Sequence, residues 1–245
     1  MVKVSFMKFV ITILITVMFV FTVQAKSSES DSSVATPSAK VVLVTGFSAF
    51  DGESINPSFQ AVEELPDSIK GYKVIKKQLP VSFGQSVIVL DNYIKEYNPA
   101  IIINVGQAGG RSEISLERIA INIDDARIPD NDGVKPVNKE ISKDGDNAYF
   151  TKLPIYKIKK AINGEGIPAK ISNSAGTYVC NHIMYELLHQ LADNYPNKIG
   201  GFIHVPYSTA QAVSKENVPN MSIDNMTIAI DVAINISIES LKNHG

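Results

Sequence analysis

The stretch Pro99-Ala-Ile-Ile-Ile-Asn-Val-Gly106 is a short apolar run that ends in glycine. A run of this length, rich in β-branched residues and bounded by proline and glycine, predicts a buried strand. Val41-Val-Leu-Val-Thr-Gly46 has the same form nearer the N-terminus. These two runs indicate the centre of a sheet that helices cover on both faces.

Helical patterns separate and follow these runs. Asn56-Pro57 predicts a helix start, with asparagine as the cap and proline at the first position. Residues 83–97 carry apolar side chains at helical spacing. The order strand, helix, strand, helix, strand predicts a single three-layer α/β/α domain with a mixed, mostly parallel twisted sheet. Further strands are expected at 74–79, 117–123 and 201–207, and further helices at 154–163, 180–195 and 223–241.

Two segments are less regular. The tail from Ile223 to Leu241 fits both strand alternation and helical spacing, and its length favours a helix. Residues 124–147 are polar and contain Pro129, Gly133, Pro136 and Gly145. A loop this long inside a compact domain is usually functional or disordered.

The composition limits the functional classes. The chain has 245 residues, 44% of them apolar, and a net charge of −2, which fits one domain with a leader. Near-neutral charge argues against a nucleic-acid partner, which needs a basic face. Cys180 is the single cysteine, so an internal disulfide and a cysteine-rich zinc site are both excluded. We expect no metal and no cofactor.

The N-terminus has the features of an export signal. Lys3 and Lys8 precede an apolar run over residues 9–21, and small residues stand at Val23 and Ala25. This pattern predicts a signal peptide over residues 1–25, with an uncleaved membrane anchor as the alternative. Residues 26–39 are rich in Ser, Glu and Asp and are expected to form a disordered spacer before a folded body at 40–245. The predicted location is therefore periplasmic or secreted, without stable membrane association once the leader is removed.

Cys180 lies at the start of a predicted helix. The apolar residues after it recur at helical spacing, namely Ile183, Met184, Leu187, Leu188 and Leu191. Unpaired N–H groups and the helix dipole at such a start favour an anion, so we expect the pKa of the thiol to be lowered. The alternative is a small buried side chain without chemistry, since free cysteine is often buried.

A cysteine nucleophile needs a base and often a group that orients the base. The four histidines compete for the first role. His204 lies near the end of a predicted strand, where sites form in α/β sheets, although a core histidine is the alternative. His182 lies two positions after Cys180 and should point to the other side of the helix. His189 lies further along that helix and His244 is close to the C-terminus. The candidate acids are Glu113, Glu117, Asp124, Asp125 and Asp130.

Three loops should meet at the carboxyl ends of the strands, namely 47–52, 81–84 and 107–111. The last of these belongs to Gly106-Gln-Ala-Gly-Gly-Arg111, which could cradle an anion but is a weak signal alone. Asp124 and Asp125 open the long polar loop and fit solvated turn residues. The G-x-S-x-G, G-x-x-x-x-G-K and H-E-x-x-H motifs are absent from the sequence.

Five ordered blocks resemble a known family. From about Val41 to the end, the chain is similar to pyroglutamyl peptidase I, a family of cysteine peptidases that remove N-terminal pyroglutamate. The blocks are residues 45–57, 106–111, 115–130, 172–182 and 201–207.

The resemblance implies roles for individual residues. Cys180 matches the nucleophile, His204 the base and Glu117 the acid that orients it. Arg127, with the Cys180 backbone N–H, matches the oxyanion site. The matching substrate-binding residues are Phe47, Phe50, Asn56, Gln107, Ile128, Tyr178 and Val179. Tyr178 stands where phenylalanine is expected, and Ser48-Ala49 replaces an acidic residue followed by proline.

The predicted function is therefore the removal of pyroglutamate from peptides by a Cys-His-Glu triad through a thioacyl-enzyme. A secreted protein that binds pyroglutamyl caps without cutting them is the alternative. A third hypothesis is a nucleoside phosphorylase that binds phosphate through residues 106–111. The resemblance also implies assembly into a tetramer or dimer, while a leader is unusual for this family.

Overall fold

The computed structural model describes residues 39–242. The predicted signal peptide (residues 1–25), the predicted spacer up to residue 38, and His244 lie outside these residues. Ala39, which we assigned to the spacer, already belongs to the first strand, β1 (Ala39–Phe47), so the folded body starts one residue earlier than predicted.

A 7-stranded sheet in the order β2-β3-β1-β4-β9-β5-β8 forms the middle of the domain. β3, β1, β4 and β9 run parallel, β5 is antiparallel to β9 and parallel to β8, and β2 is antiparallel to β3. The predicted mixed, mostly parallel sheet is therefore confirmed. The other strands of this sheet are β2 (Ser68–Ile69), β3 (Tyr72–Leu79), β4 (Pro99–Gln107), β5 (Ile114–Glu117), β8 (Ala169–Ser172) and β9 (Ile199–Val205).

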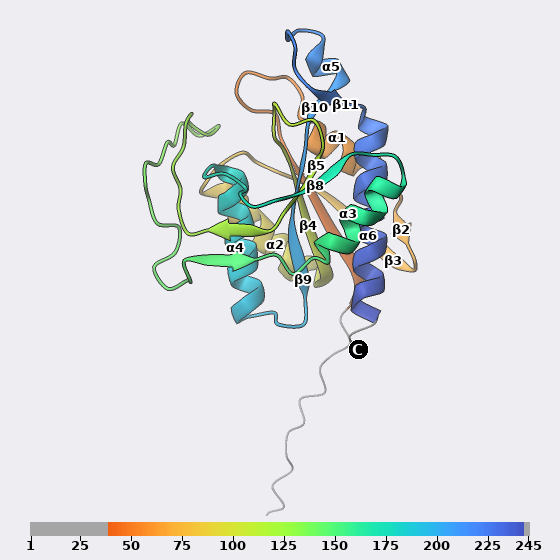
Figure 1. Cartoon of the computed structure of the whole chain (residues 1–245). Coiled ribbons are helices and arrows are strands. Elements are labelled where there is room, and N and C mark those ends of the chain that lie inside the picture. The colour runs from red at the N-terminus through yellow and green to blue at the C-terminus, as the bar shows by residue number, and fades with distance from the viewer. Residues whose placement is uncertain (1–38, 243–245) are drawn as a thin grey trace, which may run out of the picture. The chain divides into compact units, whose positions relative to one another are not determined.

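Helices cover both faces of this sheet (Figure 1). On one face lie α1 (Pro57–Glu63), α3 (Ile155–Gly164) and α6 (Ile223–Lys242), and on the other lie α2 (Gln85–Tyr97) and α4 (Val179–Asp193). Val42 and Val44 of β1 belong to the first apolar core and Leu43 to the second. Successive residues of a strand point to opposite faces, which is why the central strands are apolar throughout.

The first helix begins where the sequence predicts. Asn56 caps α1, and its side chain accepts a hydrogen bond from the Ser58 N–H. A Cβ added at Gly46 would lie 2.4 Å from the Phe59 Cα, closer than real Cβ atoms approach backbone. Glycine at the end of β1 therefore lets α1 pack directly on the strand, and this packing fixes the loop between them.

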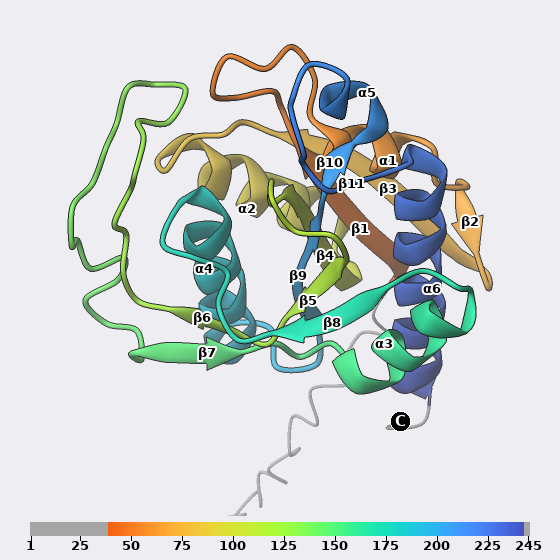
Figure 2. The same cartoon turned by 45° about the horizontal axis from the view of Figure 1, so that its top comes forward.

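The predicted strand over 117–123 is wrong, because two strands occupy it. β5 ends at Glu117, the Arg118 N–H donates to the Ser172 carbonyl, and the chain then leaves the main sheet. β6 (Ile119–Ile121) pairs with β7 (Ala148–Phe150) in a separate ribbon (Figure 2). Alternation along a strand reports which residues are buried and carries no information on the partner strand, so it missed this change.

The tail is a helix, α6, as its length favoured, because tertiary packing buries one face of it. The long loop over 124–147 contains only one isolated bridge, between Asp124 and Lys139. The prediction did not include the short elements β2, β7, β8, β10 (Tyr207–Ser208), α5 (Thr209–Ala212) and β11 (Asn220–Met221).

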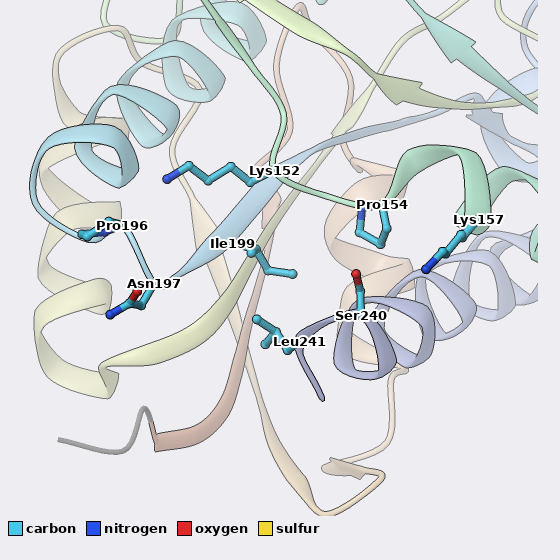
Figure 3. A pocket seen from close by; sticks show the side chains of 8 residues that line it. All are labelled: Lys152, Pro154, Lys157, Pro196, Asn197, Ile199, Ser240 and Leu241. Carbon is cyan, nitrogen blue, oxygen red and sulfur yellow. The ribbon is translucent and has the colours of Figure 1, made fainter. Parts of the chain in front are cut away.

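A hollow lies at the amino ends of the parallel strands, where Ile199 opens β9 (Figure 3). Its lining residues are Lys152, Pro154, Lys157, Pro196, Asn197, Ile199, Ser240 and Leu241. His204 lies near the other end of β9, so this hollow is separate from the predicted site. Within residues 39–242, none of the helices has both the length and the apolar content needed to cross a membrane.

Candidate active site

The predicted site residues gather at the carboxyl ends of β1, β4 and β9. An inner pocket is lined by Phe47, Phe50, Asn56, Val81, Gln107, Tyr178, Val179 and Cys180. An adjoining outer cleft shares four of these residues and adds Arg111, Arg127, Ile128 and His204. The three loops predicted to meet at this edge therefore do so. Among the predicted residues, Glu117 alone lines neither space, because it lies behind His204.

Cys180 is the second residue of α4, as predicted. The N-cap residue, Tyr178, makes no side-chain capping bond, and Tyr178, Val179 and Cys180 at this helix start all line the inner pocket. A Cβ added at Gly106 would lie 3.0 Å from Cys180 Sγ and 2.7 Å from the Phe202 ring. Gly106 pairs with His204 across the β4–β9 ladder. The missing side chain at Gly106 thus allows the thiol to approach the sheet beside His204.

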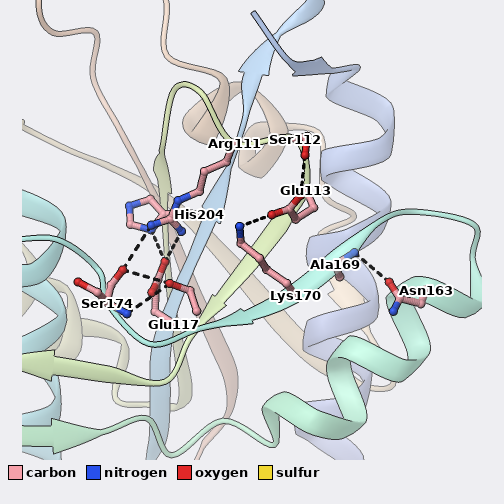
Figure 4. Close-up of polar contacts among 10 residues, drawn as sticks. Arg111, Ser112, Glu113, Glu117, Asn163, Ala169, Lys170, Ser174 and His204 are labelled. Carbon is pink, nitrogen blue, oxygen red and sulfur yellow. Dashed lines mark hydrogen bonds and ion pairs between the residues drawn. The ribbon is translucent and has the colours of Figure 1, made fainter.

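His204 is held by a buried carboxylate (Figure 4). Its Nδ1 lies 2.7 Å from Glu117 Oε1, and the two side chains are 4% and 0% exposed. Arg111 Nη1 lies 2.6 Å from the same oxygen, and Arg111 Nη2 donates to the Ser174 carbonyl. A carboxylate only accepts hydrogen bonds when ionised, so Nδ1 carries the proton and Nε2 is left as the acceptor.

Burial and the neighbouring charges shift the pKa values of Glu117 and His204. Burial alone would raise the pKa of the Glu117 carboxyl, but the hydrogen bond from His204 and the contacts with Ser172 and Arg111 outweigh it, and the pKa is lowered. Burial lowers the pKa of His204, against the opposing effect of Glu117. At neutral pH the pair is therefore an ionised carboxylate and a neutral imidazole, which is the form that can accept a proton.

The predicted lowering of the thiol pKa is wrong for this structure. Burial, together with the negative charge of Glu117, raises the pKa of Cys180 to about 12, although Arg111 acts in the opposite direction. The sequence showed the helix start but not the desolvation of the thiol, which lies on a half-buried residue, or the carboxylate near it. Desolvation of a thiolate can outweigh a helix dipole, which contributes about 0.3–1 kcal/mol at exposed positions. Cys180 thus rests as a neutral thiol beside a neutral imidazole.

The walls of the inner pocket are aromatic. Phe47 is buried against Phe202, with ring centroids 6.3 Å apart. Tyr178 lies between Phe50 and Phe83, at centroid distances of 6.3 Å and 5.4 Å. Flat apolar walls of this kind suit a small neutral ring.

Asn56 holds the backbone segment that forms one wall of the pocket. Its Nδ2 donates to the Ser48 carbonyl, and its Oδ1 accepts from the Ser58 hydroxyl. Ser58 Oγ in turn accepts from the Phe47 N–H. This chain of bonds fixes the backbone that carries Phe47, so Asn56 braces the pocket that it also lines.

The long loop is an ordered wall of the cleft along its first part. Asp130 is 6% exposed, and its carboxylate accepts from the N–H groups of Phe83, Asp132 and Val134. The Tyr178 hydroxyl donates to the Pro129 carbonyl at 3.0 Å. The tyrosine that replaces the expected phenylalanine therefore ties the start of α4 to the loop segment that brings Arg127 and Ile128 to the cleft.

Half-buried His182 and buried Asp124 form a second pair away from the thiol. His182 Nδ1 lies 2.8 Å from Asp124 Oδ2, and Asp124 is 3% exposed. Asp124 is therefore not the solvated turn residue that the sequence suggested, because the helix that carries His182 covers it. His189 stacks on Tyr149 and pairs with Asp193 on its own helix, as its distance from the helix start predicted.

The sequence alone gave no role to two residues of the site, Arg111 and Val81. In the sequence Arg111 is only the last residue of a glycine-rich block, whereas in the structure it forms an ion pair with Glu117. Val81 lines the pocket from a loop that was predicted to reach this edge. Arg127 lies at the exposed mouth of the cleft.

A thiol at a helix start, a buried imidazole and a buried carboxylate around one cleft are the groups that cysteine hydrolases use for acyl transfer. The family comparison agrees, since a model of the family described as pyroglutamyl peptidase matches residues 40–240. The chain belongs to the pyroglutamyl peptidase family.

Relatives in this family match over nearly their whole length. A pyrrolidone-carboxylate peptidase of Thermosipho melanesiensis is 54% identical over 193 residues, which cover 79% of this chain and 96% of that protein. The one from Clostridium botulinum is 48% identical and covers 81% and 93%.

Solved structures agree with the fold. The crystal structure of pyroglutamyl peptidase I from Bacillus amyloliquefaciens superposes with a TM-score of 0.79 at 46% identity, covering 82% of this chain and 96% of that one. A mutant pyrrolidone carboxyl peptidase from Pyrococcus furiosus gives the same TM-score and identity, with coverage of 82% and 99%. The three-layer architecture is therefore that of the family.

Proposed function

We propose that this protein removes pyroglutamate from the N-terminus of peptides through a thioester formed on Cys180. The observation that carries the proposal is the imidazole of His204, held at Nδ1 by Glu117 in the cleft that Cys180 also lines. The family names of the relatives supply the substrate class.

In the first step, Cys180 gives its proton to His204 Nε2 as Sγ attacks the carbonyl carbon that joins pyroglutamate to the next residue. The thiol rests in its neutral form, so proton transfer accompanies the attack. The oxyanion is stabilised by the Cys180 N–H at the open helix end and by the Arg127 guanidinium at the mouth of the cleft.

In the second step, protonated His204 gives its proton to the leaving nitrogen, the C–N bond breaks, and the shortened peptide leaves. A water molecule then loses a proton to His204 and attacks the thioester, which frees pyroglutamate and restores the thiol. Glu117 holds the imidazole in one orientation and stabilises its charged form through both steps.

Selectivity follows from the inner pocket. Its residues within the described chain are apolar or carry neutral amides, a thiol and the hydroxyl of Tyr178, and none of them is a carboxylate. The pyroglutamyl ring is neutral, whereas a free N-terminus is a cation. Burying a cation without a partner is costly, so peptides with a free N-terminus are excluded.

Hydrolysis of a pyroglutamyl fluorogenic substrate beside its prolyl analogue tests the proposal. The enzyme should cleave the first and spare the second, and alkylation of Cys180 or the Cys180→Ser change should abolish turnover. A Cys180→Ser variant as fast as wild type would end the thiol mechanism. Binding of the substrate without any release of pyroglutamate would instead favour the non-catalytic binder.

We also propose that residues 1–25 direct export and are removed. Mass spectrometry of the mature N-terminus and cell fractionation test this, and retention of the leader in the membrane fraction would favour the anchored alternative. Export would place Cys180, the sole cysteine, in an oxidising compartment without an internal disulfide partner. Activity of the exported enzyme should therefore rise on addition of a reductant.

A further inference from the structure

Gln211 lies behind the inner pocket, against the amide that the resemblance places on the substrate ring. It belongs to the short helix α5, outside the five blocks of family resemblance, and is 4% exposed. Its Nε2 lies 3.1 Å from Gln107 Oε1 and 3.4 Å from the Ile55 carbonyl oxygen. In Figures 1 and 2, α5 lies near the loop that follows β1, at the same edge of the sheet as the cleft.

The orientation of both amides follows from partners that can act in only one way. The Ser208 backbone N–H can only donate, so the Gln211 atom 3.1 Å from it is the oxygen. The Ile55 carbonyl can only accept, so the Gln211 atom facing it is the nitrogen. That nitrogen also faces Gln107, so Gln107 must present its own oxygen to Gln211.

A charged pair secures this arrangement from the solvent side. Glu53 Oε2 accepts from Gln211 Nε2 at 3.3 Å, and Glu53 Oε1 pairs with Lys215 Nζ at 2.7 Å. The hydrogen bond from Lys215 helps to lower the pKa of the Glu53 carboxyl, so this group remains an acceptor at neutral pH. Every neighbour of the Gln211 nitrogen is therefore an acceptor, and the amide cannot turn over without losing its bonds.

We infer that Gln211 is a positioning residue that fixes the Gln107 amide with its oxygen turned away from the pocket and its NH₂ group turned toward the substrate ring. This inference rests on the proposed function. An NH₂ group matches the lactam carbonyl oxygen of a pyroglutamyl ring. The same group faces no acceptor on a prolyl ring, and it repels the protonated prolyl nitrogen, which an amide oxygen would attract.

The Gln211→Glu change tests this most directly. A carboxylate can still accept from the Ser208 N–H but cannot donate to Gln107, so Gln107 should turn its NH₂ group toward position 211 and its oxygen toward the pocket. We expect KM for a pyroglutamyl-anilide to rise about tenfold, the effect of one lost hydrogen bond, with a smaller change in kcat. The ratio of kcat/KM for the pyroglutamyl over the prolyl substrate should fall.

Because a second carboxylate beside Glu53 can destabilise α5, Gln211→Met serves as a second variant that removes all the side-chain hydrogen bonds of Gln211 at similar volume. It should raise KM in the same direction by about threefold, since Gln107 is then free to adopt either orientation. Gln85→Glu, at an exposed position on α2, is the matched control and should leave KM unchanged. The thermal midpoint of each variant is measured alongside.

A double-mutant cycle with Gln107→Ala separates positioning from general packing. If Gln211 acts through Gln107, then Gln211→Met should add no further rise in KM once Gln107 has been truncated. Additive rises in KM, or equal losses on both substrates, would overturn the inference while leaving the proposed function intact. Wild-type enzyme that is inactive on the pyroglutamyl substrate would overturn the proposed function, and the inference with it.

Discussion

Two histidine–carboxylate pairs lie near the start of α4, and they differ in what they face. His204 and Glu117 meet at 2.7 Å, and His182 and Asp124 meet at 2.8 Å, each through the histidine Nδ1. Only His204 lines the cleft beside Cys180. The His182 ring instead meets the edge of Phe83, with centroids 5.5 Å apart.

The nearer histidine in sequence is therefore the one that does not line the cleft. Residues two apart on a helix point in different directions, so Cys180, Asn181 and His182 each meet a different neighbour. The Asn181 amide bonds the backbone of Ile121, and His182 holds the first residue of the long loop. Both histidines have a carboxylate on Nδ1, so what favours His204 as the proposed base is its place in the cleft that Cys180 also lines.

The largest expected effect separates the two histidines. His204→Asn removes the proposed base and should lower kcat/KM by about 1,000-fold or more. His182→Asn should change it by less than about fivefold, since an asparagine can still bond Asp124. Steady-state assays on the pyroglutamyl substrate measure both. Equal losses in the two variants would mean that position beside the thiol is not what distinguishes the pairs.

Substitution of the two carboxylates, Glu117 and Asp124, should also have different effects. The first should lower kcat and the second should lower stability. Glu117→Gln should lower kcat by about 100-fold or more, because the amide neither stabilises the imidazolium nor fixes its tautomer. Asp124→Asn should keep most of the activity and lower the free energy of unfolding by about 1–3 kcal/mol, as expected when a buried bond is weakened. Denaturant unfolding followed beside kcat decides between these outcomes, and a stable but inactive Asp124→Asn variant would contradict the assignment.

Arg111 contacts the Glu117 carboxylate and the Ser174 carbonyl, and its charge should act on the His204–Glu117 pair through the pH profile. Its positive charge lowers the pKa of His204 and the pKa of the Cys180 thiol. Arg111→Met should raise both pKa values, and because the proposed base is neutral His204, the acid limb of kcat/KM against pH should move to higher pH. Arg111→Lys should restore much of the shift. An acid limb that stays in place in Arg111→Met would show that the charge does not reach the base.

The smallest effect concerns the tie between α4 and the long loop. Tyr178→Phe removes the hydroxyl that donates to the Pro129 carbonyl but keeps the aromatic wall. We expect a loss of about 0.5–1.5 kcal/mol in unfolding free energy and a change in kcat/KM within about threefold. Thermal melts and steady-state kinetics measure the two. A large loss of activity would mean that the hydroxyl contributes to catalysis rather than to anchoring the loop.

Local patterns predicted the main elements well. Continuous apolar runs identified β1 and β4, and apolar residues at helical spacing identified α2 and α4. Asn56 and Pro57 marked the first turn of α1 because a cap and a fixed φ act within a few residues. The break at Arg118 was missed, since it depends on a partner strand distant in the sequence.

The sequence by itself predicted the α/β layering and the position of Cys180 at a helix start, and the resemblance identified the family and supplied the proposed roles of the site residues. Only the tertiary structure decided which acid holds which histidine, that Arg111 shares the Glu117 oxygen, that Gln211 bonds the Gln107 amide, and that the thiol pKa is raised. Periodicity reports burial along one element, whereas pairing and pKa depend on distances and desolvation between elements that lie far apart in the chain.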